Sequence, residues 1–518
     1  MDIGKKESRI LTYVAWTLVA ISAMILLAKV WSRMTGNPLS VFDDAFMFIR
    51  YANNLVATGS YGWNAGEISY GCTSILYTSW FWLWQSLLHL PATSTSIMLM
   101  GSSIAFGVLA LWLLAKVLRT LAPGFPQPWL WLLPLICSQM FQANILNGMD
   151  TTLTMAALVL MILSWARYSQ RPGTNALTLA VIASYLPFLT RPDTGFFVLL
   201  FPVLWLWANE QLKAILPTVL ALGGLLLMDV LIKFWYFGDP LPIPYYAKSG
   251  DLLLGYLGME EWPVEQYLLS FLLIGAPSVV VVILSGERIS WKVLLAFYAP
   301  MMLTLLVLSL KIQIMGYNAR FFLPSIPFLI LGPLASIPRK KMALPPRTPW
   351  LLLCWSAMAL TGIFIGEFHE RRVEREEAEA DAVMAAHHPN EDSLANQNLL
   401  YQILDLLPAG ATFAATEHGY LSVKYPDLNI FDLAGLHDVR IAKTGYRDSL
   451  LREVAPQVIW MPHSDYVGLR EAMKSGAFFQ QAYLFLPGEY EYGLAIYLAG
   501  PSTEAIKQVL DRRGLLLP

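Results

Sequence analysis

The run ILTYVAWTLVAISAMILLAKVW at residues 10–31 decides the fold class of this chain. About 20 apolar residues are enough to cross the roughly 30 Å of hydrocarbon in a bilayer. A secretory signal peptide has a shorter apolar core and a small-residue cleavage site, so the run is interpreted as an uncleaved first membrane span. Lys5, Lys6 and Arg9 precede it. Because basic residues concentrate on the cytoplasmic side, the N-terminus is predicted to be cytoplasmic.

Similar apolar segments recur through the first 366 residues. They lie at about 73–92, 97–116, 129–147, 150–167, 174–189, 195–208, 213–234, 266–285, 291–310, 318–336 and 349–366. The sequence is 56% hydrophobic and 14% charged, against roughly 25% charged residues in soluble domains. We predict a polytopic α-helical membrane protein with roughly 11–13 transmembrane helices. The count depends on 73–147, where one segment has to be interfacial or re-entrant if the loop around Asp150 faces outward.

The recurring apolar segments end at Gly366, and a charged stretch follows. Residues 1–366 are predicted to form the membrane domain, 367–394 a charged linker, and 395–518 a soluble α/β domain. Gln457–Met461 and Leu494–Leu498 have the pattern of short strands, and 446–454 and 503–512 that of amphipathic helices. The basic loops place the first loop, 32–72, and the C-terminal domain on the outer side. The net charge of −2 excludes a bulk basic surface, so no nucleic-acid partner is expected.

The first outer loop carries the residues that point to chemistry. It reads FDDAFMFIRYANNLVATGSYGWNAGEISYGCT at 42–73. Residues 45–57 are predicted to form an amphipathic helix that lies on the membrane, with Asp43 near its N-terminus. An acid in that position is often only a helix cap. Two adjacent acids, followed by Arg50, Asn64 and Glu67 in one loop, favour a functional site.

Glycosyl transfer requires such a set of side chains. A carboxylate takes the proton from the attacking hydroxyl. A leaving phosphate needs cations or a metal ion to stabilise its developing charge. Sugar hydroxyls need amide and carboxylate partners.

Several motifs resemble those of the GT-C superfamily of integral-membrane glycosyltransferases. The first loop, with DDAFMFIRYANNL, the later GE and the GCTS at 71–74, is most similar to the bacterial branch that includes terminal arabinofuranosyltransferases. Further similar motifs follow in order: GMDT at 148–151, TRPD at 190–193, YFGDPLP at 236–242 with YYAK at 245–248, RFFLP at 320–324, EHGY at 417–420 and DLAGLHD at 432–438. Tyr70 departs from the resemblance, because relatives carry a glutamate there.

The resemblance implies an enzyme of the bacterial plasma membrane. It implies inverting transfer of a sugar, arabinofuranose or another pentose or hexose, from a polyprenyl-phosphate donor. The acceptor would be an envelope glycan, lipid or protein on the outer side. Some members need a divalent cation (Mg, Mn or Ca) and others do not. Two alternatives stay open: a transporter or flippase of lipid-linked sugars, and a non-catalytic envelope-assembly protein.

The predicted roles divide into three groups. Asp43 and Asp44 are the predicted catalytic acids, directly or as metal ligands. The predicted ligands of the donor phosphate are Arg50, Lys248 and Arg320. The predicted sugar or acceptor ligands are Asn64, Glu67, Tyr70, Asp150, Arg191, Asp193 and His418.

Several of these residues also have a purely structural interpretation. Arg191 and Asp193 have the alternative of an ion pair between two spans. Asp150 has that of a cap, and His418 that of a structural residue beside the sheet. Asp229 is expected to pair with Lys233 one turn later, with a structural role.

Overall fold

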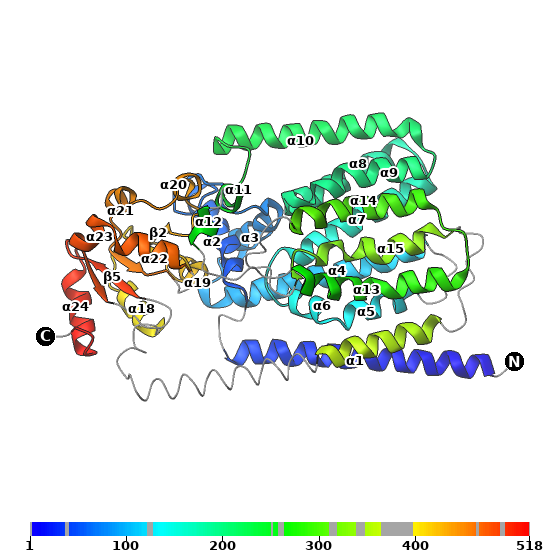
Figure 1. Cartoon of the computed structure of the whole chain (residues 1–518), viewed down its shortest axis with the longest axis horizontal. Helices are drawn as coiled ribbons and strands as arrows, with labels where there is room; N and C mark the ends of the chain where they lie inside the picture. Colours follow the sequence, from blue (N-terminus) through cyan, green and yellow to red (C-terminus); the bar gives the residue numbers. More distant parts are fainter. Residues whose placement is uncertain are drawn as a thin grey trace.

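The computed structural model describes residues 3–36, 41–121, 128–249, 252–256, 264–309, 319–337, 348–363, 397–462, 466–486 and 493–516. A helical bundle occupies one end of the molecule and an α/β region the other, with α2 (Phe46–Thr58) where the two meet (Figure 1). The predicted linker, 367–394, lies outside the described residues.

Six of the described helices are long and apolar enough to cross a membrane. They are α1 (Ile3–Gly36), α4 (Ala92–Leu121), α7 (Thr151–Gln170), α10 (Ile215–Phe237), α13 (Val264–Ser285) and α14 (Trp291–Ser309). Four shorter apolar helices accompany them, namely α8 (Thr174–Thr190), α9 (Gly195–Ala208), α15 (Ile326–Ser336) and Thr348–Ile363. The chain is therefore a polytopic helical membrane protein.

Helix α7 forms the centre of the bundle. Of its span 83% is buried, whereas only 17% of the α1 and α10 spans is buried. It packs against α4 and α8. Inside α10, Lys233 Nζ lies 2.7 Å from Asp229 Oδ2, and this confirms the predicted pair.

Two segments between 73 and 147 differ from continuous spans. The first forms α3 (Ile75–Leu88), whose 14 residues reach about 21 Å and fall short of the hydrocarbon thickness. The second, 129–147, breaks into η2 (Pro128–Leu132), α5 (Leu133–Ile136) and α6 (Gln139–Asn144). Ser138 starts α6 by accepting a hydrogen bond from the Phe141 amide at 3.2 Å.

The α/β region contains a five-stranded mixed sheet in the order β2-β1-β3-β5-β4. The strands are β1 (Thr412–Ala415), β2 (Asn429–Asp432), β3 (Val458–Trp460), β4 (Tyr483–Leu486) and β5 (Leu494–Tyr497). The helices are α18 (Gln397–Leu404), α19 (Gly419–Lys424), α20 (Val439–Thr444), α21 (Asp448–Val454), α22 (Val467–Lys474), α23 (Ala477–Ala482) and α24 (Thr503–Arg512). The two predicted strands are confirmed as β3 and β5, and the two predicted helices as α21 and α24.

Helix α2 is covered on two sides and does not present the one open apolar face that is expected of an amphipathic helix on a membrane. It packs against α3 on the bundle side and against α19 on the α/β side. Phe46, Ile49 and Ala52 are buried, as a helical periodicity predicts, but so are Arg50 and Tyr51. Because both sides of the helix are covered, α2 is the joint between the two parts of the chain.

Arg50 fastens this joint, so its predicted role as a phosphate ligand was wrong. Its Nε donates to the Trp63 carbonyl at 2.8 Å. Its other nitrogens donate to backbone carbonyls of the α/β region, at Ser422, Tyr425, Pro426 and Leu428. Burial lowers the pKa of Arg50 to about 10, which leaves it charged at neutral pH. Every nitrogen of the guanidinium is engaged, and none faces a ligand.

Replacing Arg50 by lysine is expected to destabilise the chain by about 1–3 kcal/mol, because a lysine amine has three donors against five and leaves buried carbonyls unpaired. The measurement is thermal unfolding of the full chain in detergent. Arg512→Lys on exposed α24 is the matched control. Equal unfolding temperatures for the two variants would show that Arg50 does not hold the joint.

Candidate functional site

A cavity of about 640 Å³ lies between the bundle and the α/β region, and we call it the central cavity. Its lining includes the charged or titratable residues Asp43, Asp44, Asp150, Arg191, Asp193, Lys248, Arg320, Glu417, His418 and His437. Most of the predicted site residues therefore come together here, but Arg50, Asn64, Glu67 and Tyr70 do not. Helix ends, turns and short helices supply most of this lining.

Asp43 holds the α/β region and does not cap its own helix. Its carboxylate accepts hydrogen bonds from the backbone amides of Gly419, at 2.7 Å, and Tyr420, at 3.0 Å. A side chain at Gly419 would collide with the Asp43 backbone carbonyl. Although these amides favour the charged form, burial is the larger effect and raises the pKa of Asp43. With both oxygens occupied, Asp43 is a weak candidate for a base.

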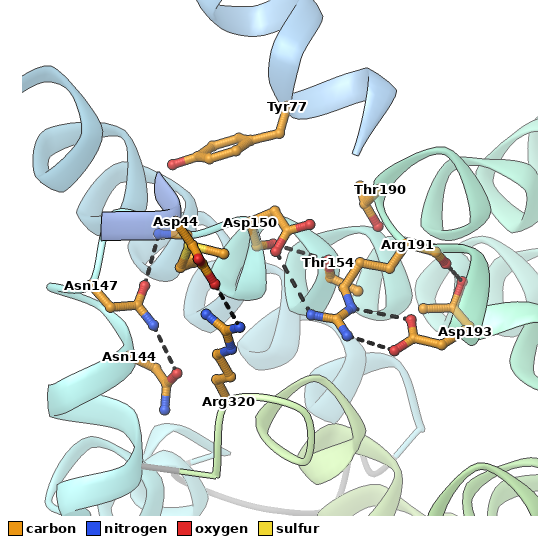
Figure 2. Close-up of polar contacts among 12 residues, drawn as sticks. Asp44, Tyr77, Asn144, Asn147, Asp150, Thr154, Thr190, Arg191, Asp193 and Arg320 are labelled. Atoms are coloured by element: carbon orange, nitrogen blue, oxygen red, sulfur yellow. Dashed lines mark hydrogen bonds and ion pairs between the residues drawn. The ribbon is translucent and has the colours of Figure 1, made fainter. Parts of the chain in front are cut away.

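Asp44 faces the central cavity and pairs with Arg320. The Arg320 Nη2 lies 3.1 Å from Asp44 Oδ2 (Figure 2). Arg320 is 4% exposed, and its Nε and Nη1 have no hydrogen-bond acceptor among the described residues. Buried guanidinium donors are costly to leave unpaired, so this site is suited to a bound anion.

Arg191 ties the cavity wall together. It donates to both oxygens of Asp193, at 3.1 and 2.6 Å, and its Nη1 lies 3.8 Å from Asp150 Oδ1 at the start of α7 (Figure 2). These contacts fit the structural alternative of an ion pair between spans. The same three side chains also line the cavity, so they set its charge as well as its shape.

Lys248 and Glu417 contribute an amine and a carboxyl group to the lining of the central cavity. Lys248 lies on α11 (Ile243–Ser249), and within the described residues neither side chain has an ion pair or a side-chain hydrogen bond. Burial, reinforced by Arg320 and Arg191, lowers the pKa of Lys248 to about 8 against the effect of Asp44. Burial and the nearby Asp43 and Asp44 raise the pKa of Glu417 to about 8. At neutral pH the amine is mostly charged and the carboxyl mostly protonated.

The sheet places a second set of groups on the cavity. Strands β1 and β2 are parallel neighbours, so the residues that follow Ala415 and Asp432 emerge at the same edge. His418 Nε2 lies 3.1 Å from Asp432 Oδ1. Burial opposes charging of His418, but Asp432, Asp43 and Glu417 outweigh it and raise its pKa. The pair with Asp432 agrees with a structural histidine that also lines the cavity.

His437 remains neutral and packs against the first loop. Burial lowers the pKa of His437 to about 3, and its ring stacks on Trp63 with centroids 4.0 Å apart. The His437 ring also lies close to the backbone of Gly71. A side chain at position 71 would collide with His437 and with the Tyr51 hydroxyl. The GCTS motif therefore marks a close contact between the two parts of the chain.

Three predicted sugar ligands lie outside the central cavity. Asn64, Glu67 and Tyr70 line a neighbouring cavity of about 600 Å³, the side cavity. Asn64 was predicted to bind sugar, but its amide is taken by the backbone of β2: its oxygen accepts from Ile430 N at 2.8 Å and its nitrogen donates to Ile430 O at 3.2 Å. The fold of the loop around α2 separates these residues from Asp44.

The metal role suggested for Asp43 and Asp44 does not fit their surroundings. Asp43 accepts two backbone hydrogen bonds, and Asp44 pairs with a guanidinium. Among the described residues no group of three histidine, cysteine, aspartate or glutamate side chains is placed to hold a metal ion. The acidic pair therefore does not form a joint ligand set.

The sequence did not single out Glu417, His437 or Trp63 as site residues. A signal existed for the first two, because EHGY and DLAGLHD contain them. Their position depends on parallel pairing of two strands that are short and separated by a helix, and no local pattern reports that pairing.

Replacing Gly419 by alanine is expected to loosen the α/β region from the first loop, because the new methyl group meets the Asp43 carbonyl. A lower unfolding temperature in detergent is the expected result. Gly223→Ala is the control, since a side chain there meets nothing within 4 Å. An unchanged unfolding temperature for Gly419→Ala would contradict this contact.

Comparison with protein-family models, with curated protein sequences and with solved structures gave no match.

Proposed function

We propose that this chain is an inverting glycosyltransferase that moves a sugar from a polyprenyl-phosphate donor to an envelope glycan, lipid or protein on the outer side of the bacterial plasma membrane. The proposal includes the GT-C type of fold, a cytoplasmic N-terminus and an extracytoplasmic α/β region. Among the described residues its membrane part contains the six long and four shorter apolar helices described above, which is fewer than the roughly 11–13 that the sequence predicts, because α3 is short and 129–147 is broken. The observation that carries it is a pair of cations with free donors, Lys248 and Arg320, beside the carboxylate of Asp44.

These groups match the charge changes of the reaction. The acceptor oxygen attacks the anomeric carbon, the bond from that carbon to the phosphate oxygen breaks, and the acceptor proton passes to Asp44. Negative charge accumulates on the departing phosphate, where Lys248 and the free N–H groups of Arg320 stabilise it. Glu417, protonated at neutral pH, donates a hydrogen bond to the sugar or the phosphate.

A lipid-linked donor also needs an apolar site next to these cations. A cavity of about 650 Å³ lies among the membrane helices, with Leu273 and Ile274 of α13 and Met358 of the helix Thr348–Ile363 in its lining. Ala319 lines this apolar cavity, and the next residue, Arg320, lines the central cavity. The polyprenyl chain of the donor would then bind in the apolar cavity, and its phosphate would bind in the central cavity.

Replacing Asp44 by asparagine is expected to lower the transfer rate about 10²–10⁴-fold, because the base is lost. The assay uses the full chain in nanodiscs with labelled polyprenyl-phosphate arabinose or hexose and an envelope glycan extract. Asp44→Glu, which keeps a carboxylate, is expected to retain more activity, and Asp511→Asn on exposed α24 is the control.

Full transfer by Asp44→Asn would remove Asp44 from the mechanism. Movement of intact donor across a vesicle membrane, with no new glycosidic bond, would favour the transporter hypothesis. Neither transfer nor movement with any supplied donor would favour an assembly protein.

Donor binding is expected to weaken as the pH rises from 7 to 9. Because the pKa of Lys248 is about 8, its charged fraction falls about tenfold over that range, and a neutral amine no longer neutralises phosphate. The measurement is the donor KM as a function of pH. Lys248→Arg keeps its charge and is expected to flatten the profile. Glu417 titrates in the same range, so Glu417→Gln serves as the control, and a flat profile in that variant alone would assign the effect to Glu417.

A further inference from the structure

The side cavity has the composition of a carbohydrate site, and it adjoins the central cavity. Three segments form it: the end of the first loop, residues 237–246, and the α/β region. Trp63, Leu241 and His437 line both cavities. A chain bound in the side cavity would therefore end at the wall it shares with the proposed reaction site.

Within the part of the chain that the structure describes, the side cavity offers no unpaired cation to an anionic ligand. Its cation, Arg440, is neutralised by Asp438, at 2.7 Å, and by Glu453, at 3.0 Å. Lys443 is likewise paired with Asp239 at 2.8 Å. Glu67 adds a carboxylate that no cation pairs among the described residues. A phosphate would find no free positive group here, in contrast to the central cavity.

The same groups suit a ligand rich in hydroxyl groups. The exposed carboxylates of Glu67 and Glu453 can accept hydrogen bonds from hydroxyls. Asp438 is occupied, because it caps α20 and pairs with Arg440. Tyr70 stacks on Phe237 with centroids 4.7 Å apart, and Trp63 on His437. Rigid aromatic surfaces beside a few polar groups are typical of ligand sites, and the C–H faces of a sugar ring pack on such surfaces.

The indole N–H of Trp63 is a further group that could bind a ligand. Trp63 is 2% exposed, and its indole N–H has no acceptor among the described residues. The Trp63 backbone is held by Arg50 and Asn54, which donate to its carbonyl, and its ring is held by stacking on His437. A buried donor of this kind is usually paired, and it lies in the wall between the two cavities.

We infer that the side cavity binds a neutral oligosaccharide, which serves as the acceptor of the proposed transfer. Its role as an acceptor site rests on the proposed function, whereas the binding itself does not. Within this assignment the two cavities divide the substrates by charge: the lipid phosphate binds beside Lys248 and Arg320, and the uncharged glycan binds beside Glu67 and Arg440.

The test is direct binding of the full chain in detergent to an array of neutral, phosphorylated and carboxylated oligosaccharides. Neutral oligosaccharides are expected to bind. Val439, 42% exposed, lines the side cavity at the start of α20, so Val439→Trp fills the cavity without removing an ion pair. It is expected to weaken binding at least about tenfold. Val467→Trp is the matched control, because Val467 is 51% exposed and starts α22 in the same region.

The outcomes separate this inference from the proposed function. Preference for the charged oligosaccharides, binding to none of the three classes, or equal binding by wild type and Val439→Trp would overturn the inference, whatever the transfer assay gives. Neutral glycan binding that Val439→Trp abolishes, in a chain that transfers no sugar, would support the binding site and sink the transferase. Intact glycan binding by Asp44→Asn, with transfer lost, would support both.

Discussion

The structure depends on the burial of α2 between the bundle and the α/β region. A helix covered on two sides needs partners for its polar groups on both. Asp43, in the 3-10 turn that precedes α2, and Arg50, on α2, provide them by bonding to the backbone of residues 419–428. These contacts use charged side chains against backbone groups, which are stronger than neutral hydrogen bonds. This joint, together with the contact between α11 and α20, positions the cavity walls that the α/β region contributes.

The joint also accounts for two glycines. Gly419 and Gly71 lie where the two parts of the chain come closest, and a side chain at either would meet backbone or ring atoms of the other part. Both occur in motifs that contain potential site residues. A small residue in such a motif is therefore explained by close packing and needs no direct role in chemistry.

Charge is distributed unevenly once the joint has formed. Around the central cavity, Arg191 is fully occupied by Asp193 and Asp150, whereas Lys248 and part of Arg320 have no partner among the described residues. Around the side cavity, the basic groups are paired. Unpaired buried donors are rare in folded proteins because desolvation is costly. The difference between the two cavities is the physical basis for assigning them different ligands.

The sequence by itself determined the class of the molecule and some of its elements. Long apolar runs such as 10–31 are suited to lipid, and the short apolar runs and helical patterns near 446–512 predicted β3, β5, α21 and α24. It also determined which loops carry acids and cations. Only the tertiary structure decided which of these side chains remain available to bind a substrate. Asp43, Arg50 and Asn64 have the same residue types as ligands of a substrate, but each is consumed by the backbone of a segment more than 360 residues away. Local spacing carries no information about such contacts, because they form only when α2 is buried between two parts of the chain that are distant in sequence.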